Sequence, residues 1–335
     1  MGVGYIFKKV WRMDIRNFLS VINELHIKTK KSRFFLLKDI ANCAKNYRAG
    51  YMDYRMFNMY DLTDEERSII LTSGKNNDFV ANLNPKEYSK LFHEKILFNQ
   101  RFHAFLGRSW INLSERTVDD FEEFLADKDR IIVKPVDACC GQGIEVIEPS
   151  KYETAQKLYD YLIETKRPLV EEVIEQDDEM KAIYPHAVNT FRIVTVISDS
   201  GKVSIVGSYL RVGNNGNVVD NFNHGGIAAP VNTETGKLEH LFRDKQSNYY
   251  EKHPETQFPL YGYTFKRWNE IIETAKKLAL VVPQMRYVGW DLCLTKKGVA
   301  VIEANEYPGN DLYQLPKEHI GTCDIIEAAI ACNDI

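Results

Sequence analysis

The chain has 335 residues, of which 27% are charged, and a formal net charge of −4 with acids and bases interspersed. This length supports two or three packed subdomains, and the charge pattern predicts no nucleic-acid partner. No apolar stretch approaches the roughly 20 residues that a transmembrane helix needs. The N-terminus has no apolar core of a signal peptide, and the six cysteines form no CxxC pair, so we expect a cytoplasmic protein with reduced thiols.

The N-terminal 80 or so residues are predicted to be helical. Apolar residues recur at helical spacing over residues 14–27 and 34–44. Thr63 and Glu66 form a capping-box pattern that predicts a further helix start. The basic run at residues 28–33 between the first two helices is interpreted as a solvated loop, rather than as a membrane or phosphate patch.

Further helices are predicted over residues 85–106, which include Lys95, and from Thr117 to Leu125. Residues 131–135 then form a predicted strand that ends near Lys134. A small-residue segment with Gly141 and Gly143 separates it from a second predicted strand at residues 144–148.

A strand, a small-residue loop and a strand can form a flap whose backbone N–H groups cover phosphates. The segment is not a Walker loop, which requires GxxxxGK[ST] before a helix. A plain hairpin with a glycine turn is the alternative. Lys134 favours the flap, because a lysine is rarely placed at a buried strand end without a partner.

The middle of the chain alternates strands with polar segments. Ser150 and Glu153 predict a cap for a helix that ends near Glu164. The elements that follow are a strand at 168–174, an acidic segment at 175–179, a hairpin at 190–198 and 202–212 carrying Arg192 and Arg211, a polar loop at 214–226 containing Asn221 and His224, and a helix at 268–281. A long polar loop between strands is more often functional than idle.

Residues 289–310 predict a second hairpin. A three-residue loop ending at Gly298 would pair Thr295 with Val299 and place Asp291 opposite Glu303. Asn305 would share their face, because strand side chains alternate. Carboxylates about 5 Å apart repel by about 1 kcal/mol in water and about 3 kcal/mol at an effective dielectric of 20, so the pair favours a bound cation.

Two carboxylates and an amide oxygen are ligands suited to Mg²⁺. The alternative is an exposed hairpin with both acids in solvent. The prediction depends on register, because a slip by one residue would turn Asp291 away from Glu303.

In order and spacing, these parts resemble the ATP-grasp fold, most specifically at Val301–Gly309 (VIEANEYPG). Residues 189–192 (NTFR), 221–226 (NFNHGG) and 308–312 (PGNDL) resemble more narrowly the sugar-transfer-associated ATP-grasp family, over roughly residues 85–320. The resemblance implies an α+β fold in which two subdomains clamp ATP, preceded by a helical N-terminal subdomain. The expected divisions are residues 1–84 (helical subdomain), 85–128 (lead-in helices), 129–176 (small ATP-grasp subdomain with the flap) and 177–335 (large subdomain).

The resemblance also implies roles for individual residues. The ATP-binding residues it implies are Lys95 and Lys134 at the α- and β-phosphates, Gly141 and Gly143 in the flap, Glu171, Glu172 and Val173 at adenine, and Glu179 at ribose. The metal ligands it implies are Asp291, Glu303 and Asn305, holding one or two Mg²⁺ ions, with Mn²⁺ as an alternative.

Arg192, followed by Arg211, is the implied candidate to neutralise the transferred phosphoryl group. Asn221 and His224 would face the γ-phosphate or the acceptor. His224 has two open roles, a base toward an amine or a simple hydrogen-bonding group.

The activity implied is that of an ATP-dependent carboxylate–amine ligase, which forms an amide through an acyl phosphate. Its partners would be small-molecule or glycan carboxylates and amines in polysaccharide or cell-surface glycan modification. A kinase acting on a sugar or other hydroxyl, and a non-catalytic nucleotide-binding scaffold, are the alternatives. Neither the substrates nor the oligomeric state can be derived from the sequence.

Overall fold

The computed structural model describes residues 14–135, 145–314 and 321–332, and the predicted flap glycines Gly141 and Gly143 lie outside them. The chain divides into two compact units. One comprises Met1–Phe79 and Gly309–Asp324, and the other comprises Val80–Pro308 and Ile325–Ile335. Within the described ranges, no helix has both the length and the apolar character needed to cross a membrane.

The first unit is helical, as the sequence predicts. Its elements are α2 (Ile15–Thr29), α3 (Arg33–Asn46), α4 (Tyr51–Met56), η1 (Met59–Asp61), α5 (Asp64–Ile69), the first turns of α6 (Ser73–Leu83) and η6 (Leu312–Gln314). The predicted capping box is present, because Thr63 and Glu66 exchange hydrogen bonds of 2.7 and 3.3 Å. Leu25, Leu36 and Tyr54 are fully buried in the core of this unit.

The second unit begins with short helices where the sequence predicts one helix at residues 85–106. They are η2 (Lys86–Tyr88), α7 (Lys90–His93), α8 (Lys95–Arg101) and η3 (His103–Phe105). Glu94 has extended backbone angles and interrupts the helix. The prediction was wrong because the interrupted segment packs its aromatic side chains on a common partner: the rings of Phe92 and Phe102 lie 6.0 and 5.5 Å from that of Trp290.

A four-stranded antiparallel sheet forms the small part of this unit. Its strands are β1 (Trp110–Asn112), β2 (Ile131–Lys134), β3 (Glu145–Ile147) and β4 (Leu169–Glu172), in the order β1-β4-β2-β3. Helices α9 (Val118–Leu125) and α10 (Ala155–Glu164) complete its core. The predicted cap at Ser150 is wrong, because η4 (Pro149–Lys151) comes first and Thr154 caps α10.

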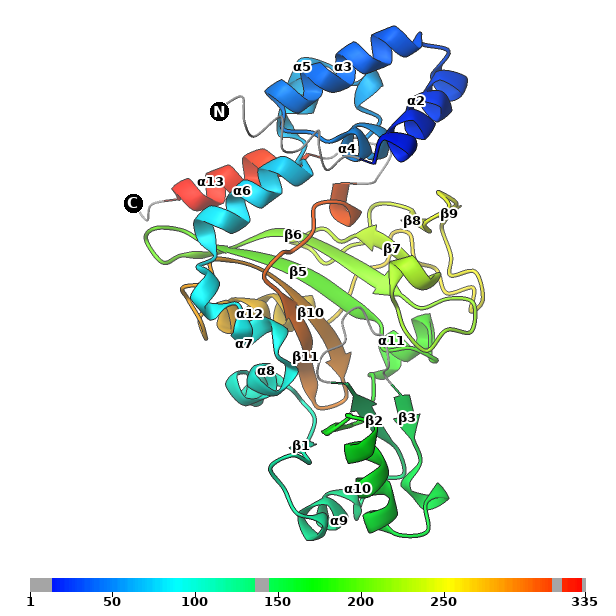
Figure 1. The fold of residues 1–335 in the computed structure, drawn as a ribbon, viewed down its shortest axis with the longest axis vertical. Helices are drawn as coiled ribbons and strands as arrows, with labels where there is room; N and C mark the ends of the chain where they lie inside the picture. Colours follow the sequence, from blue (N-terminus) through cyan, green and yellow to red (C-terminus); the bar gives the residue numbers. More distant parts are fainter. Residues whose placement is uncertain (1–13, 136–144, 315–320, 333–335) are drawn as a thin grey trace. The chain divides into compact units, whose positions relative to one another are not determined.

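The large sheet has seven antiparallel strands in the order β11-β10-β5-β6-β7-β8-β9 (Figure 1). They are β5 (Thr190–Ile197), β6 (Val203–Val212), β7 (Ile227–Pro230), β8 (Phe242–Arg243), β9 (Tyr249–Tyr250), β10 (Tyr287–Thr295) and β11 (Gly298–Asn305). The remaining helices are α11 (Asp178–Ile183), η5 (Phe222–His224), α12 (Trp268–Ala279) and α13 (Cys323–Ala331). Helices and antiparallel strands together confirm the α+β class.

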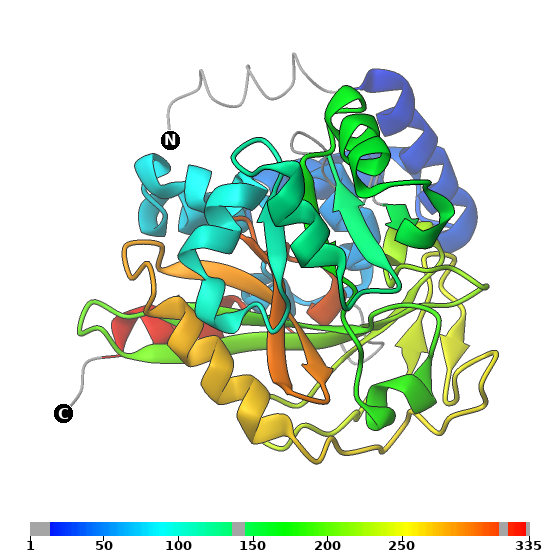
Figure 2. The ribbon, with the colours of Figure 1, turned by 90° about the horizontal axis from the view of Figure 1, so that it is seen from below.

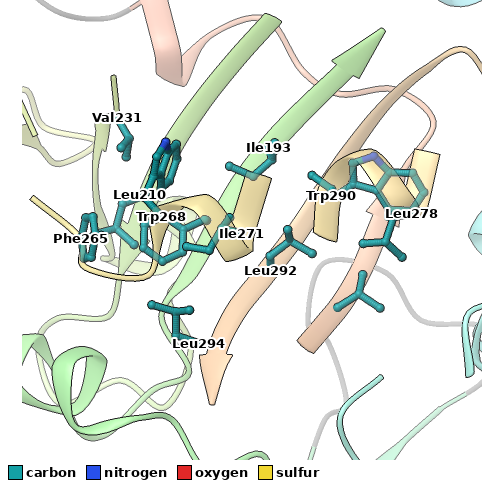
Figure 3. Close-up of a cluster of buried hydrophobic side chains, with 14 of the residues drawn as sticks. Ile193, Leu210, Val231, Phe265, Trp268, Ile271, Leu278, Trp290, Leu292 and Leu294 are labelled. Atoms are coloured by element: carbon teal, nitrogen blue, oxygen red, sulfur yellow. The ribbon is translucent and has the colours of Figure 1, made fainter. Parts of the chain in front are cut away.

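Helix α12 lies along one face of this sheet (Figure 2). Its Trp268 and Ile271 pack in one cluster with Ile193 of β5 and Leu292 of β10 (Figure 3). Because side chains alternate along a strand, Gly289, Asp291 and Cys293 of β10 lie on the opposite face. The core therefore fixes which face of the sheet can carry a polar site.

Candidate functional site

The predicted pairing of Asp291 with Glu303 is confirmed, although the turn differs. Thr295 pairs with Gly298 instead of Val299, so the loop is one residue shorter than predicted. A register shift between Asp291 and Leu292 compensates, because Leu292 pairs with Val301 and Asp291 with Glu303. Ile302 is the extra residue of this β-bulge.

The bulge decides which side chains of β11 face the polar side of the sheet. Val301 and Ala304 both belong to the buried cluster, although strict alternation would place them on opposite faces. The extra residue between them turns Glu303 and Asn305 toward the face of Asp291. Without it, Glu303 would point into the apolar core.

Asp291 is held by two arginines on this face. It is 0% exposed. Arg192, its neighbour on β5, donates through Nε to Oδ1 and through Nη2 to Oδ2 at 3.0 Å, and Arg211 Nη2 donates to Oδ2 at 2.8 Å. Although burial opposes ionisation, the two guanidinium groups lower the pKa of Asp291 to about 2. The pKa values of both arginines are raised despite their burial, that of Arg192 by Asp291 and that of Arg211 by Asp220 and then Asp291.

Gly289 provides the space for Arg192. A Cβ atom at Gly289 would lie 2.9 Å from Cδ of Arg192 and 3.2 Å from Cα of Pro308. The Arg192 guanidinium also donates from Nη1 to the Pro308 carbonyl at 3.1 Å. Any larger residue at Gly289 would displace the arginine that holds Asp291.

Asp220 and Thr190 complete the surroundings of Arg211, and no role was predicted for either residue from the sequence. Asp220 is buried and lies 3.4 Å from Arg211 Nε, and Thr190 Oγ1 accepts from Arg211 Nη2 at 2.8 Å. The loop that begins at Asp220 is closed by Gly226, whose N–H donates to Asn221 at 3.1 Å. The sequence feature that could have identified Asp220 is its position directly before the glycine-rich loop.

Glu303 and Asn305 lie on the same face as Asp291 and differ in exposure. Glu303 is solvent-exposed, yet its pKa is raised by surrounding protein atoms and by the negative charge of Asp291. Asn305 Nδ2 is buried and has no hydrogen-bond partner among the described residues. Amide oxygen and nitrogen positions are interchangeable by a flip, so this side chain can present its oxygen instead.

These residues fit a hard divalent cation. The described residues contain no group of three His, Cys, Asp or Glu side chains suited to a metal. The candidate set on this face is two carboxylates, Asp291 and Glu303, and the amide of Asn305. An unsatisfied amide beside two repelling acids is the donor set expected where Mg²⁺ also keeps water and phosphate ligands.

A second charged cluster lies on the small sheet. Glu171 of β4 accepts from Lys134 Nζ at 2.6 Å, from Arg108 Nε at 2.7 Å and from Asn99 Nδ2 at 2.8 Å. Its pKa is lowered, because the two cations outweigh its complete burial. Arg108 also donates to the Val301 carbonyl at 2.8 Å, which ties this cluster to β11.

The structure brings both predicted phosphate-binding lysines to the end of β2. Lys95 Nζ donates to the Pro135 carbonyl at 3.0 Å, directly after Lys134. Burial lowers the pKa of Lys134, whereas Glu171 and, more weakly, Glu303 raise it. Lys134 therefore lies within electrostatic reach of the carboxylate face of β11.

The residues predicted at adenine and ribose are placed as follows. Glu171 is turned inward to Lys134, whereas its neighbour Glu172 is half-buried and accepts from Ser109 N–H and Oγ–H, both at 3.0 Å. Val173 follows directly and is half-buried. Glu179 lies on α11 and accepts from the Tyr263 hydroxyl at 2.7 Å. None of these four contacts the arginines around Asp291.

Asn221 and His224 lie at η5. Asn221 Oδ1 accepts from the Asn223 N–H at 2.8 Å. The Asn221 side chain therefore caps the start of η5. His224 is exposed, and its ring forms no hydrogen bond with a described residue. The structure does not join either side chain to the Asp291 cluster.

Glu171→Gln and Glu172→Gln form a matched pair of neighbouring substitutions. We expect Glu171→Gln to lower the free energy of unfolding by about 3 kcal/mol, because buried Arg108 and half-buried Lys134 lose their counter-charge. Glu172→Gln should change it by less than about 1 kcal/mol, because its surroundings are partly hydrated. Because the pKa of Glu171 is lowered, its contribution is present above its ordinary pKa and is lost on acidification.

Urea denaturation of both variants at neutral and acidic pH measures these differences. Equal losses in the two variants would contradict the assigned burial of Glu171.

The chain is similar to known proteins only at low sequence identity. No curated protein matches the chain. Among solved structures, D-alanyl-alanine synthetase A from Vibrio cholerae is 12% identical, with a TM-score of 0.44 over 77% of this chain and 72% of its own. The ATP-grasp ligase PsnB complexed with minimal precursor is 13% identical, with a TM-score of 0.44 over 84% and 75% of the two chains.

A family profile described as sugar-transfer associated ATP-grasp matches residues 74–321. This range includes Lys95, Lys134, Asp291 and the whole β10–β11 hairpin. The chain therefore belongs to the sugar-transfer associated ATP-grasp family, and its fold is the ATP-grasp fold.

Proposed function

We propose that the protein is an ATP-dependent carboxylate–amine ligase that joins its substrates through an acyl phosphate. The observation that carries the proposal is the polar face of β10 and β11, where an exposed Glu303 and the unsatisfied amide of Asn305 lie beside Asp291, which two arginines hold. Phosphoryl transfer depends mainly on positioning and on positive charge against developing negative charge. The cations on this face and at Lys134 meet that requirement.

In this proposal Lys95 and Lys134 bind the α- and β-phosphates of ATP at the end of β2. Asp291, Glu303 and Asn305 hold one or two Mg²⁺ ions, for which Mn²⁺ could substitute. When bound, Mg²⁺ supplies positive charge that neutralises the phosphate oxygens. Arg192 and Arg211 keep Asp291 ionised and oriented, and their remaining N–H groups add positive potential to the face.

Two further assignments concern the nucleotide. Glu172 and Val173 are better placed than Glu171 to meet adenine, because Glu171 is occupied by Lys134 and Arg108. Glu179 would meet the ribose. Gly141 and Gly143 would cover the phosphates, and Asn221 and His224 would face the acceptor.

The substrates in this proposal are a carboxylate and an amine of small-molecule or glycan origin, with a role in polysaccharide or cell-surface glycan modification. A cytoplasmic location would supply ATP. It agrees with the four cysteines at positions 43, 293, 323 and 332, which are free thiols in the described part of the chain.

Mass spectrometry of reaction products tests the proposal. The protein is incubated with ATP, Mg²⁺ and a pool of amino acids, uronic acids and amino sugars. We expect ADP, inorganic phosphate and a product whose mass is the sum of an acid and an amine less one water. The matched control is Glu122→Gln on α9, an exposed acid remote in sequence from the site, which should remain active.

Other outcomes would replace the proposal. ADP together with a phosphorylated acceptor, and without inorganic phosphate, would indicate a kinase. Binding of ATP and Mg²⁺ without turnover of any pool would indicate a nucleotide-binding scaffold.

A further inference from the structure

The helical unit carries a segment whose composition differs from the rest of the chain. Residues 27–38 (IKTKKSRFFLLK), here named the basic–apolar segment, contain five basic residues and no acid, in a chain of net charge −4. The segment joins the end of α2 to the start of α3. These helices are adjacent, and Arg33 donates to Asn23 of α2 at 2.8 Å (Figure 1).

Large apolar side chains of this segment are exposed. Phe34 is 78% exposed, Ile27 67%, Phe35 45% and Leu37 41%. Ser32 caps α3, so Phe34, Leu37 and Lys38 share one side of the helix at spacings of three and four. The opposite side buries Leu36, so the core of the helical unit is complete without the exposed residues.

The basic charges of the segment are largely uncompensated. Lys28, Lys30, Arg33 and Lys38 form no ion pair with any residue in the described ranges. Lys31 is the one basic residue of the segment that forms an ion pair in the described part of the chain, with Asp61 at 3.0 Å. The acids next to the segment in sequence are paired elsewhere, Glu24 with Arg55 at 3.1 Å and Asp39 with Arg67 at 2.8 Å. The exposed apolar residues therefore lie within a region of net positive charge.

We infer that the basic–apolar segment docks the protein on an anionic lipid surface. Single exposed apolar residues need no explanation. A group of them among lysines that form no ion pair is complementary to a bilayer interface. The apolar side chains enter the headgroup boundary, while the lysines and Arg33 meet lipid phosphates. A partner that binds only through charge would contact the basic side chains and leave Phe34 exposed to water.

Docking of this kind needs no transmembrane helix. It revises the interpretation of residues 28–33 as a merely solvated loop. The inference is independent of the proposed ligase activity, because it uses none of the residues on the polar face of the large sheet.

Vesicle co-sedimentation of the full chain tests the inference. We expect binding to vesicles of phosphatidylcholine mixed with phosphatidylglycerol and little binding to phosphatidylcholine alone. Binding should weaken between about 0.1 M and about 0.5 M salt, because the charges are screened. Lys30→Gln with Lys38→Gln should weaken it on the order of 30-fold.

Phe34→Ser distinguishes insertion from charge attraction, and we expect it to weaken binding roughly 10-fold. The matched controls are Tyr261→Ser, which removes an aromatic side chain that is 56% exposed on the other unit, and Lys276→Gln with Lys277→Gln on α12. These controls should bind vesicles like the unchanged protein. The altered side chains are exposed, except Lys276, which is half-buried and pairs with Glu273 at 2.9 Å. Thermal unfolding confirms that each variant is folded.

Three results would overturn the inference. The first is absence of binding to anionic vesicles. The second is binding that Phe34→Ser leaves unchanged, which would indicate a purely electrostatic surface. The third is a dimer that Phe34→Ser dissociates in light scattering, which would make the apolar side chains an interface between two copies of the chain.

Discussion

Glu303→Gln is expected to lower ATP turnover by roughly 100- to 1000-fold while leaving the protein as stable as before, or more stable. The loss of activity follows from its proposed role as the exposed carboxylate among the metal ligands. The gain in stability follows from its pairing with Asp291, because like charges across a sheet repel. A glutamine amide can instead donate to the Asp291 carboxylate.

The pH dependence of this gain has a defined sign. The pKa of Glu303 is raised in the folded protein, so ionisation opposes folding and its cost appears as pH rises above its ordinary pKa. The stability difference between Glu303→Gln and the unchanged protein should therefore be largest at neutral pH and vanish in acid.

Thermal unfolding with and without Mg²⁺ and ATP provides a readout that needs no acceptor. The ligands should raise the unfolding temperature of the unchanged protein, and of Glu122→Gln, more than that of Glu303→Gln. Full ATP turnover by Glu303→Gln would show that Glu303 is not a metal ligand. A large loss of stability would show that it is a structural acid.

Asp291→Asn is expected to have the opposite effect on stability, lowering the free energy of unfolding by about 3 to 5 kcal/mol. Arg192 is buried and Arg211 is half-buried beside Asp291. An asparagine leaves Arg192 without its carboxylate partner and leaves Arg211 with Asp220 alone. Substitution of these two paired acids should therefore change the free energy of unfolding in opposite directions, because only Asp291 is held by two arginines.

Acidic pH should remove the difference in stability between Asp291→Asn and the unchanged protein. The pKa of Asp291 is about 2, below its ordinary value, so its contribution is present above the ordinary pKa and is lost as the pH falls toward 2. Urea unfolding between neutral pH and about pH 3 measures the loss against Asp291→Asn.

Two further variants make the result specific. Asp244→Asn changes another buried carboxylate, one that accepts from Asn248 and Tyr250 at 2.8 Å, and should cost about 1 to 2 kcal/mol. Adding Arg192→Met to Asp291→Asn should cost less than the sum of the single changes, because it removes one unpaired charge. Additive losses would contradict the shared ion pair.

Much of the fold could be predicted from local patterns. Helical spacing identified α2 and α3, capping boxes identified the starts of α5 and α9, and alternation identified the β5–β6 and β10–β11 hairpins. These signals act within a few residues, so the sequence contains them directly. The prediction was wrong at residues 85–106, where helical spacing continues but a common aromatic core divides the segment.

The candidate site was only partly accessible from the sequence. Residue type and spacing predicted Asp291, Glu303 and Asn305 as metal ligands, and that role stays a prediction. Their shared face depended on two deviations from the predicted hairpin, a turn one residue shorter and the bulge at Ile302, whose effects on register cancel. Local patterns predicted the pairing, and the bulge made it compatible with a buried Val301 and Ala304.

The partners of the charged residues were decided by tertiary structure alone. Arg192 holds Asp291 across neighbouring strands, and Arg108 and Lys134 meet at Glu171 from separate segments. The sequence by itself determined the residue types, most helices and strands and the family resemblance. Only the folded chain determined which charges are enclosed, because burial and ion pairing depend on contacts between residues tens to about a hundred positions apart.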